Sequence, residues 1–371
     1  MKVPFADIKL NPKCKEHVYE CLSNNQLTLG KKTEQLERRW SEVNGHKYTV
    51  GVNSGTSACI AACLSLYSLG AKPGDEIITP GLSFIATSNA IRAAGFTPVW
   101  CDVKKETLNI DESLIEEKVN DKTAAIMPVS LIGKPSKVDV IRSICDEHNL
   151  YMIVDNCEGH GCKLHNKVME EYADITTYSC YAAHCLFAVE FGFCTTNRED
   201  LRDILYSVRS HGRRPYSLDF VHENFGLNLK PTDIHASIGL GSLEEYKSVI
   251  ELRRNNVEYF KSELDNLHEY CYFSEEDDDE FCSPHAFSLT FKENSRYDMG
   301  LFRKWMQLNE IEAKINFGAI PDHGCFAYMK QKDCCPNATY IGKNGVHWSV
   351  NQNLHNNQLD HVVDIVQRFF Q

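Results

Sequence analysis

Residues 151–155, Tyr151-Met152-Ile153-Val154-Asp155, form a short apolar run that ends in an aspartate. A run of this length and composition predicts a buried strand with an acid at its carboxyl end. A second such run, Ile175-Thr176-Thr177-Tyr178, follows and leads directly into Ser179. The carboxyl ends of these two strands are therefore the first place to look for functional side chains.

Strand-like and helical segments alternate on both sides of this pair. Residues 76–79, 96–101 and 124–129 read as further strands, and residues 138–149 have the apolar spacing of a helix. This βαβ rhythm continues to about residue 200 and is typical of a mostly parallel sheet covered by helices. The sequence thus predicts an α/β fold.

Ser179 is followed five positions later by a basic residue, His184, and both lie after Asp155. This order is the layout of a pyridoxal 5'-phosphate (PLP) site. In such a site the acid holds the protonated pyridine nitrogen, and the base works beside the reactive carbon of the cofactor. We therefore expect Asp155 and Ser179 to bind the cofactor and His184 to be catalytic, with PLP or its amine form, pyridoxamine 5'-phosphate (PMP), bound.

The phosphate of such a cofactor needs donors fixed in space. Ser54-Gly55-Thr56-Ser57 stands just before an alanine-rich helical stretch, residues 58–69. The free backbone N–H groups of a helix N-terminus suit a dianion, so Gly55, Thr56 and Ser57 are predicted to hold the phosphate together with Ser179. An ordinary Ser/Thr helix cap is the alternative for this segment taken alone.

An ordered series of motifs resembles, over nearly the full length, the fold type I sugar aminotransferases of the DegT/DnrJ/EryC1/StrS family. The motifs are Asn53-Ser54-Gly55-Thr56-Ser57-Ala58, Lys72-Pro73-Gly74-Asp75-Glu76, Ser83-Phe84-Ile85-Ala86-Thr87, Asp155-Asn156-Cys157-Glu158 and Asn228-Leu229-Lys230-Pro231-Thr232-Asp233. The resemblance implies a large domain with a mostly parallel seven-stranded sheet and a smaller C-terminal α+β domain. We expect an N-terminal arm and large domain over residues 1–249 and a small domain over residues 250–371.

The resemblance also implies roles for individual residues. Phe84 would stack on the pyridine ring, although a core phenylalanine is the alternative. Glu158 matches an acid near the ring, or a surface residue of the following turn. Asn228 would reach the phosphate from the second subunit of a homodimer, and His211 matches a loop near the active site of the partner, with a structural role as the alternative.

His184 stands where most members of that family have the Schiff-base lysine. Histidine cannot hold the cofactor covalently but can move a proton near neutral pH. A minority branch with histidine at this place, the sugar 3-dehydratases of deoxysugar and lipopolysaccharide O-antigen biosynthesis, removes the C3 hydroxyl of a nucleotide-linked 4-keto-6-deoxy sugar and releases ammonia. The resemblance therefore implies a lyase of this type that uses glutamate as amine donor and a GDP-sugar as the favoured substrate.

Two other interpretations stay open. A nucleotide-sugar 4-aminotransferase whose lysine has been replaced by histidine would have the same motifs. A non-catalytic cofactor- or sugar-binding protein is the second alternative, and Glu190-Phe191-Gly192-Phe193, where the family usually has Glu-Gly-Gly, lends it some weight.

Composition excludes several classes. A chain of 371 residues with 43% hydrophobic content can bury a large core. The formal net charge of −12 argues against nucleic-acid binding, although a local basic pocket for a nucleotide diphosphate stays open. We find no run of 18 apolar residues and no apolar core of a signal peptide at the start, so we expect a cytoplasmic protein without a membrane partner.

Three further expectations concern metals and loops. The 16 cysteines are scattered through apolar segments without a close Cys-x-x-Cys group, so we predict neither a metal site nor an iron-sulfur cluster. Residues 234–266 have one long helical pattern that would link the two domains. The acidic run at residues 275–280 predicts a solvated loop without function.

Overall fold

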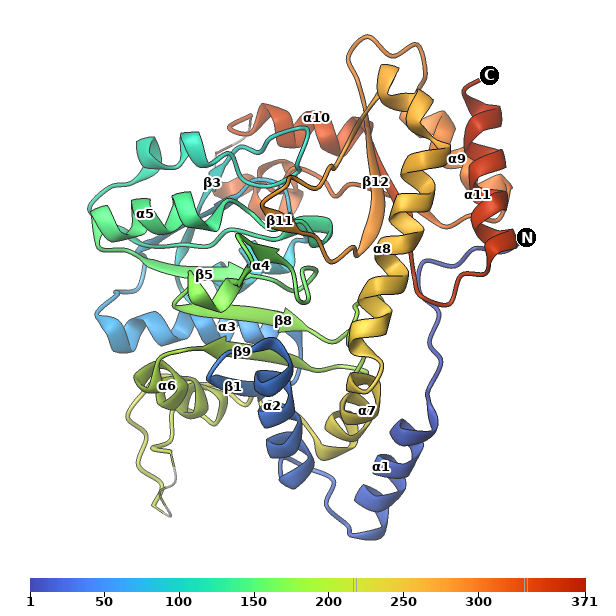
Figure 1. Ribbon diagram of the computed structural model, residues 1–371. Coiled ribbons are helices and arrows are strands. Elements are labelled where there is room, and N and C mark those ends of the chain that lie inside the picture. Colours follow the sequence, from blue (N-terminus) through green and yellow to red (C-terminus); the bar gives the residue numbers. More distant parts are fainter. Residues whose placement is uncertain (216, 218, 330, 332) are drawn as a thin grey trace.

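A seven-stranded sheet forms the centre of the protein in the computed structural model, which describes residues 1–215, 217, 219–329, 331 and 333–371. The strands lie in the order β1-β9-β8-β5-β4-β2-β3 (Figure 1). Six run in the same direction, and β9 is antiparallel to both of its neighbours. Their bounds are β1 Tyr48–Val52, β2 Glu76–Pro80, β3 Thr97–Cys101, β4 Thr123–Ile126, β5 Tyr151–Asp155, β8 Ile175–Ser179 and β9 Gly192–Thr196. The mostly parallel sheet expected from the sequence is confirmed.

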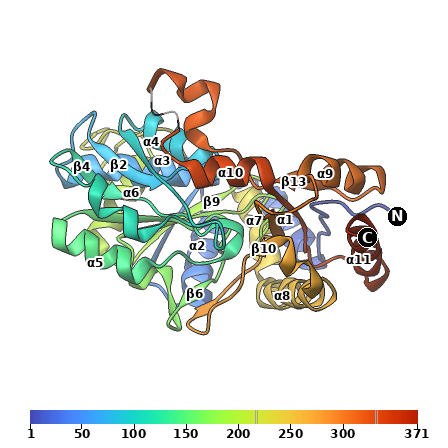
Figure 2. The same ribbon diagram turned by 90° about the horizontal axis from the view of Figure 1, so that it is seen from above.

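Helices cover both faces of this sheet (Figure 2). One face packs against α3 (Gly55–Ser65), α4 (Ala86–Ala93) and α6 (Glu199–Arg209) through a core of alanine, cysteine and branched side chains. On the other face lie α5 (Val138–His148), α2 (Lys31–Asn44) and α7 (Asp233–Leu243). Burial on both faces explains why the strands read as nearly continuous apolar runs.

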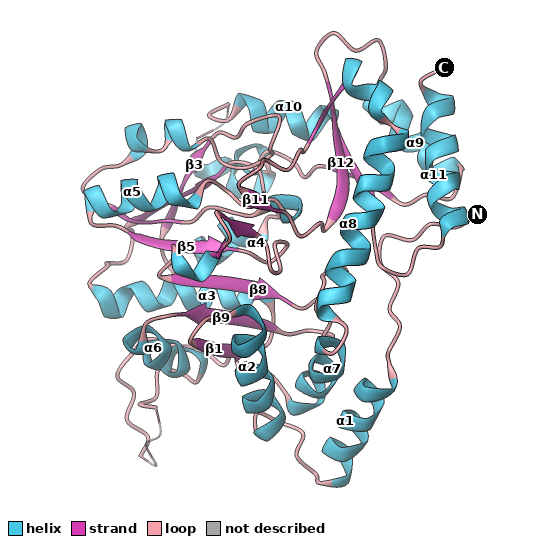
Figure 3. Ribbon diagram, in the orientation of Figure 1, coloured by secondary structure: helices cyan, strands magenta, loops and turns pink. Residues whose placement is uncertain are grey.

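A smaller antiparallel sheet follows in the C-terminal part of the chain, in the order β10-β12-β14-β13. It packs on α8 (Tyr246–Glu263), α9 and α11 (Figure 3). The hydrophobic core of this part is separate and includes Phe260, Phe302 and Trp348. The bounds are β10 Cys271–Phe273, β12 Ala286–Phe291, α9 Met299–Leu308, β13 Ala313–Ile315, α10 Pro336–Asn344, β14 Gly345–Ser349 and α11 Asn356–Phe369. The N-terminal arm leads to α1 (Pro12–Ser23), and its Val3 pairs with Ile311 of this part.

The single long helix expected over residues 234–266 is wrong. Helix α7 ends at Leu243, and α8 begins at Tyr246 and continues to Glu263. Glu245 between them has φ −104° and ψ 0°, outside ideal helical geometry. The apolar pattern continues across the break because both helices bury residues in the same core. Helix α8 crosses residue 250 without interruption. The predicted domain boundary between residues 249 and 250 therefore falls inside a continuous helix, and it stays a prediction.

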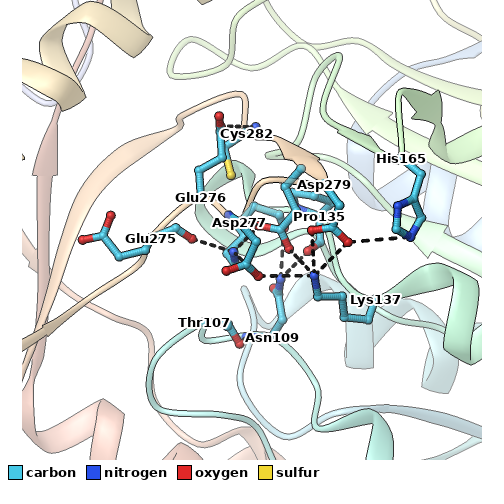
Figure 4. A network of polar contacts seen from close by, with 12 residues as sticks. Thr107, Asn109, Pro135, Lys137, His165, Glu275, Glu276, Asp277, Asp279 and Cys282 are labelled. Atoms are coloured by element: carbon cyan, nitrogen blue, oxygen red, sulfur yellow. Dashed lines mark hydrogen bonds and ion pairs between the residues drawn. The ribbon is translucent and has the colours of Figure 1, made fainter.

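The acidic run at residues 275–280 is only in part the solvated loop that the sequence predicts, because Glu275, Asp277 and Asp278 are exposed but Glu280 is buried. The side chain of Glu280 is completely buried and pairs with Lys134, and its other oxygen lies 3.1 Å from Lys137 Nζ. Figure 4 shows Lys137 reaching Asp277 and Asp279 as well, at 3.2 Å and 3.3 Å. These pairs hold the small three-stranded sheet of β6 (Lys163–Leu164), β7 (Lys167–Val168) and β11 (Glu280–Phe281). A charge count alone could not predict this, because the lysines come from a distant segment.

Candidate active site

The predicted cofactor residues gather at the carboxyl ends of the parallel strands, where α/β sheets bind ligands. Asp155 ends β5 and is 5% exposed. Its Oδ2 accepts a 2.7 Å hydrogen bond from the hydroxyl of Thr87, and its Oδ1 accepts one of 3.2 Å from the backbone N–H of Cys157. The carboxylate is thus fixed in position, as a partner for a ring nitrogen must be.

The N-terminus of α3 lies against the end of β8. The Ser54 hydroxyl accepts from the backbone N–H of Ser57 at 3.1 Å and caps the helix. A Cβ on Gly55 would lie 2.5 Å from Cβ and 2.9 Å from Oγ of Ser179. Only glycine permits this approach, which brings Ser179 beside the free N–H groups of the helix. Thr56 is exposed at the same turn. The cap and the anion cradle are therefore the same structure.

Phe84 is 60% exposed in the loop between β2 and α4. A core role is therefore excluded. Its ring makes an edge contact with Phe317, with ring centroids 6.4 Å apart. Phe84 lies near Thr87, the hydrogen-bond partner of Asp155. Its exposed ring is suited to stack on a planar ligand, and such stacking would add about 0.5–1.5 kcal/mol to the binding free energy beyond burial.

His184 lies in the loop between β8 and β9. Arg253 of α8 fixes this loop by donating to the carbonyls of Ala183 at 2.9 Å and of His184 at 3.2 Å. The His184 ring lies between the rings of His160 and His285, with centroids 5.6 Å and 5.0 Å away. Burial, His160 and Arg253 hold the pKa of His184 well below its usual value, so the ring is neutral at pH 7.

Glu158 is largely buried and is not an exposed surface residue. Its side chain is 11% exposed. Burial raises the pKa of the Glu158 carboxyl to about 7, although the backbone N–H of Ile132 donates to its Oε2 at 2.8 Å. Its other oxygen lies 3.9 Å from Nε2 of His285. This carboxyl is poised to bind or release a proton near neutral pH.

His211 and Asn228 lie apart from these residues, on the segment that follows α6. Both are exposed, and their described hydrogen bonds are made by the backbone: His211 N–H donates to the Leu227 carbonyl at 2.9 Å, and Asn228 pairs with Ser210. His211 has a φ of +63°, a conformation few residues other than glycine adopt. The roles predicted for these two residues stay predictions.

The family of this chain follows from comparison with known proteins. The sequence profile of the DegT/DnrJ/EryC1/StrS aminotransferase family matches residues 9–367. The chain belongs to this family. Its members are PLP-dependent, sugar-modifying enzymes, and the predicted recognition and fold class are confirmed.

Among curated relatives, the chain is 31% identical to a GDP-4-keto-6-deoxy-D-mannose 3-dehydratase of Yersinia pseudotuberculosis over 79% of this chain and 78% of that protein. It is 30% identical to a GDP-perosamine synthase of Escherichia coli O157:H7 over 99% and 98%. A solved GDP-4-keto-6-deoxymannose-3-dehydratase with a trapped PLP-glutamate geminal diamine has a TM-score of 0.87 at 25% identity and covers 98% of this chain and all of that one. The predicted cofactor is thereby confirmed at the level of the family.

Four residues of this family member's site were not predicted from its sequence. Thr87 stands in a quoted motif, and a hydroxyl one helical turn after Phe84 could have indicated it. His160, Arg253 and His285 carry no local signal, since each reaches the site from a separate segment.

Among the described helices, none combines the length and apolar character that a bilayer span requires.

Buried histidines make the stability of this fold sensitive to acid. Burial lowers the pKa of His160 and of His347 to about 3, against 6.5 for the unfolded chain. A lowered pKa in the folded state gives stability that is complete above pH 6.5 and is lost as the pH falls toward 3. In that window, each of the two histidines lowers the free energy of unfolding by at most about 1.4 kcal/mol for each pH unit of acidification. Urea unfolding between pH 7 and pH 5 should therefore show a falling free energy of unfolding.

Replacing His347 by glutamine tests the cause of this loss. The variant should lower the slope of unfolding free energy against pH by up to about 1.4 kcal/mol per unit, because one proton fewer is taken up on unfolding. An unchanged slope would contradict the assignment. His268, whose side chain is 47% exposed, provides the control in a His268→Gln variant.

Proposed function

We propose that this protein is a PLP/PMP-dependent dehydratase that removes the C3 hydroxyl of a nucleotide-linked 4-keto-6-deoxy sugar and releases ammonia. The observation that carries the proposal is His184, a neutral ring at the place where the family has its Schiff-base lysine. The loop from Cys180 to Phe191 contains no lysine at all. A base is thus retained while covalent storage of the cofactor is lost.

The remaining residues hold the cofactor without a covalent bond. The N–H groups at the start of α3 and the Ser179 hydroxyl bind the phosphate. Asp155, fixed by Thr87, accepts from the protonated ring nitrogen. Phe84 covers one face of the ring. When bound, the cofactor supplies an amine for the sugar ketone and a ring that accepts electrons.

His184 then takes and returns the proton whose removal expels the C3 hydroxyl. Its Nδ1 is buried and has no hydrogen-bond partner among the described residues, which leaves Nε2 as the atom we assign to proton transfer. A lysine amine at this place could also protonate the sugar and leave nitrogen attached. The imidazole of histidine is a weaker base on a shorter side chain than the lysine amine, and it moves a proton without forming a bond to carbon.

The substrates are proposed from the relatives. The named dehydratase and the perosamine synthase both carry GDP-sugars in their names, so we favour a GDP-linked substrate. Glutamate is proposed as the amine donor, in line with the glutamate adduct in the solved dehydratase. We propose that the protein acts in the cytoplasm, in deoxysugar biosynthesis for lipopolysaccharide.

A 4-aminotransferase is the second candidate. The perosamine synthase aligns with 99% of this chain, whereas the first dehydratase aligns with 79%. This function would require His184 to replace lysine in both proton transfer and cofactor release.

Product analysis distinguishes these functions. The protein would be mixed with PLP, glutamate and GDP-4-keto-6-deoxymannose, and ammonia, 2-oxoglutarate and the sugar would be measured. Dehydration yields one ammonia and one 2-oxoglutarate for each 3-deoxy-4-keto sugar. An amino sugar without ammonia would indicate the aminotransferase, and cofactor binding without any product would indicate a binding protein.

We further propose that the protein acts as a homodimer in which Asn228 completes the partner's phosphate site. The segment that carries Asn228 exposes several large apolar side chains, with Phe220 81% and Phe225 66% exposed. Its end lies beside the cradle, since Asn53 N–H donates to the Leu229 carbonyl at 2.9 Å. Exposed aromatic residues at this edge favour a second copy as their cover.

Mixing two impaired variants, Asn228→Ala and His184→Asn, tests the shared site. A mixed dimer contains one site with both native residues, so random exchange of equal amounts should restore about one quarter of the wild-type activity. Each homodimer must first be shown to be impaired, because a lost phosphate hydrogen bond costs only about 1–3 kcal/mol. No recovery after exchange proven with tagged subunits would place both residues in one chain's site.

A further inference from the structure

A second histidine and a largely buried carboxyl lie near His184. The centroids of the His184 and His285 rings are 5.0 Å apart, and Nε2 of His285 lies 3.9 Å from Oε1 of Glu158. A direct N–H···N bond of about 2.9 Å between two imidazoles places their centroids about 5 Å apart. The two rings are thus close enough for such a bond.

The nitrogen atoms that would form this bond are free. Nδ1 of His184 and Nδ1 of His285 are both buried without a hydrogen-bond partner among the described residues. A buried polar atom without a partner costs free energy, commonly 1–3 kcal/mol. Two such atoms on facing rings are therefore unusual, and sharing one proton would satisfy both.

The backbone of Ile132 holds His285 and Glu158 together. Its N–H donates to Glu158 Oε2 at 2.8 Å, and its carbonyl accepts from the backbone N–H of His285 at 3.1 Å. Ile132 adopts a φ of +57°, which is strained for a β-branched residue. Backbone strain of this kind costs about 1–3 kcal/mol and is maintained only where the surroundings require it.

We propose that His285 and Glu158 form a proton relay that returns His184 to its neutral form, an inference that rests on the proposed role of His184 as the base. A proton taken at Nε2 of His184 makes the ring cationic. His184 then releases the proton on Nδ1 to Nδ1 of His285, and His285 releases the proton on Nε2 to Glu158. Both rings end neutral, and the carboxylate ends as a carboxylic acid.

Charges around the relay favour this direction. Burial opposes a cation on His184 and on His285, and the positive charges of Arg253, and of Lys314 beside His285, oppose it further. Burial and, to a smaller extent, the charge of Asp155 oppose an anion on Glu158, whose pKa is raised to about 7. A proton is therefore held more easily on the carboxyl than on either ring, and the reverse transfer is available near neutral pH.

Glu158→Gln tests the relay without removing a structural contact. The glutamine oxygen can still accept from the Ile132 N–H, so only the charge and the proton-holding capacity are lost. The measurement is the pair of ring-nitrogen NMR signals of ¹⁵N-histidine-labelled protein without cofactor, assigned by their loss in His184→Asn and His285→Gln. We expect Glu158→Gln to shift the signals of His285 and of His184, although Glu158 does not touch His184. Unchanged His184 signals would overturn the relay.

A kinetic measurement gives a second, separate test. In Glu158→Gln and His285→Gln, kcat should fall at least about 100-fold with a small change in KM, and its dependence on pH should change shape. His268→Gln, which replaces an exposed histidine of the small domain, should retain both the His184 signals and kcat. Wild-type kcat and pH dependence in the Glu158 variant would overturn the relay. If the protein proves to make an amino sugar, the proposed dehydration fails, while the NMR result still decides the relay.

Discussion

His184→Asn is expected to stop ammonia release while the protein still binds its cofactor. Asparagine is close to histidine in size and keeps the loop that Arg253 fixes through backbone carbonyls, but it cannot take up a proton. Loss of a general base costs roughly two to four orders of magnitude in rate. The measurement is ammonia and 2-oxoglutarate formed per minute from the GDP-sugar and glutamate.

Two controls complete this experiment. Cofactor affinity of the variant should match wild type, because Asp155 and the phosphate donors are unchanged. His268→Asn, a substitution at an exposed ring in the small domain, should leave the rate unchanged. Near-normal dehydration by His184→Asn would show that another residue carries the proton.

Asp155→Ala is expected to weaken cofactor binding and abolish turnover. A hydrogen bond to a charged group contributes about 1.5–3 kcal/mol, so the Kd for PLP should rise about 10- to 150-fold. The Thr87 hydroxyl loses its acceptor at the same time. Titration of the protein with PLP, followed by absorbance, gives the Kd directly.

Asp102→Asn is the matched control for the loss of a buried carboxylate. Asp102 is 6% exposed and accepts from the backbone N–H groups of Asn337 and Ala338 at the start of α10. Its substitution should lower stability without changing the Kd for PLP. If Asp155→Ala bound PLP as tightly as wild type, the ring nitrogen would have another partner, and the orientation proposed here would be wrong.

Much of the large domain could be predicted because its signals are local. The strands at residues 76, 97, 151 and 175 begin within one residue of the segments expected from apolar runs, and α5 ends one residue earlier than expected. The helix start at Gly55 and the strand end at Asp155 were also predicted correctly. Such positions are set by neighbouring residues in the chain.

Other features depend on contacts that no local pattern contains. Glu280 was expected in a solvated loop, yet Lys134 and Lys137 come from another part of the chain and bury it. The break between α7 and α8 was missed because both helices share one apolar face. Phe191, which departs from the family pattern, is 1% exposed and fits because Gly51 leaves room for its ring.

The sequence by itself determined the order of strands and helices along the chain, the spacing of Asp155, Ser179 and His184, and the presence of histidine instead of lysine at residue 184. These features depend on short stretches of sequence, and the periodicity and spacing of the residues in those stretches indicate them directly. Only the tertiary structure decided what surrounds His184. His285 is 101 residues away along the chain, and it reaches His184 because the turn at Ile132 binds the backbone before β12 and the side chain of Glu158 at once. Contacts between segments so far apart arise from packing of the whole fold, and no local pattern records them.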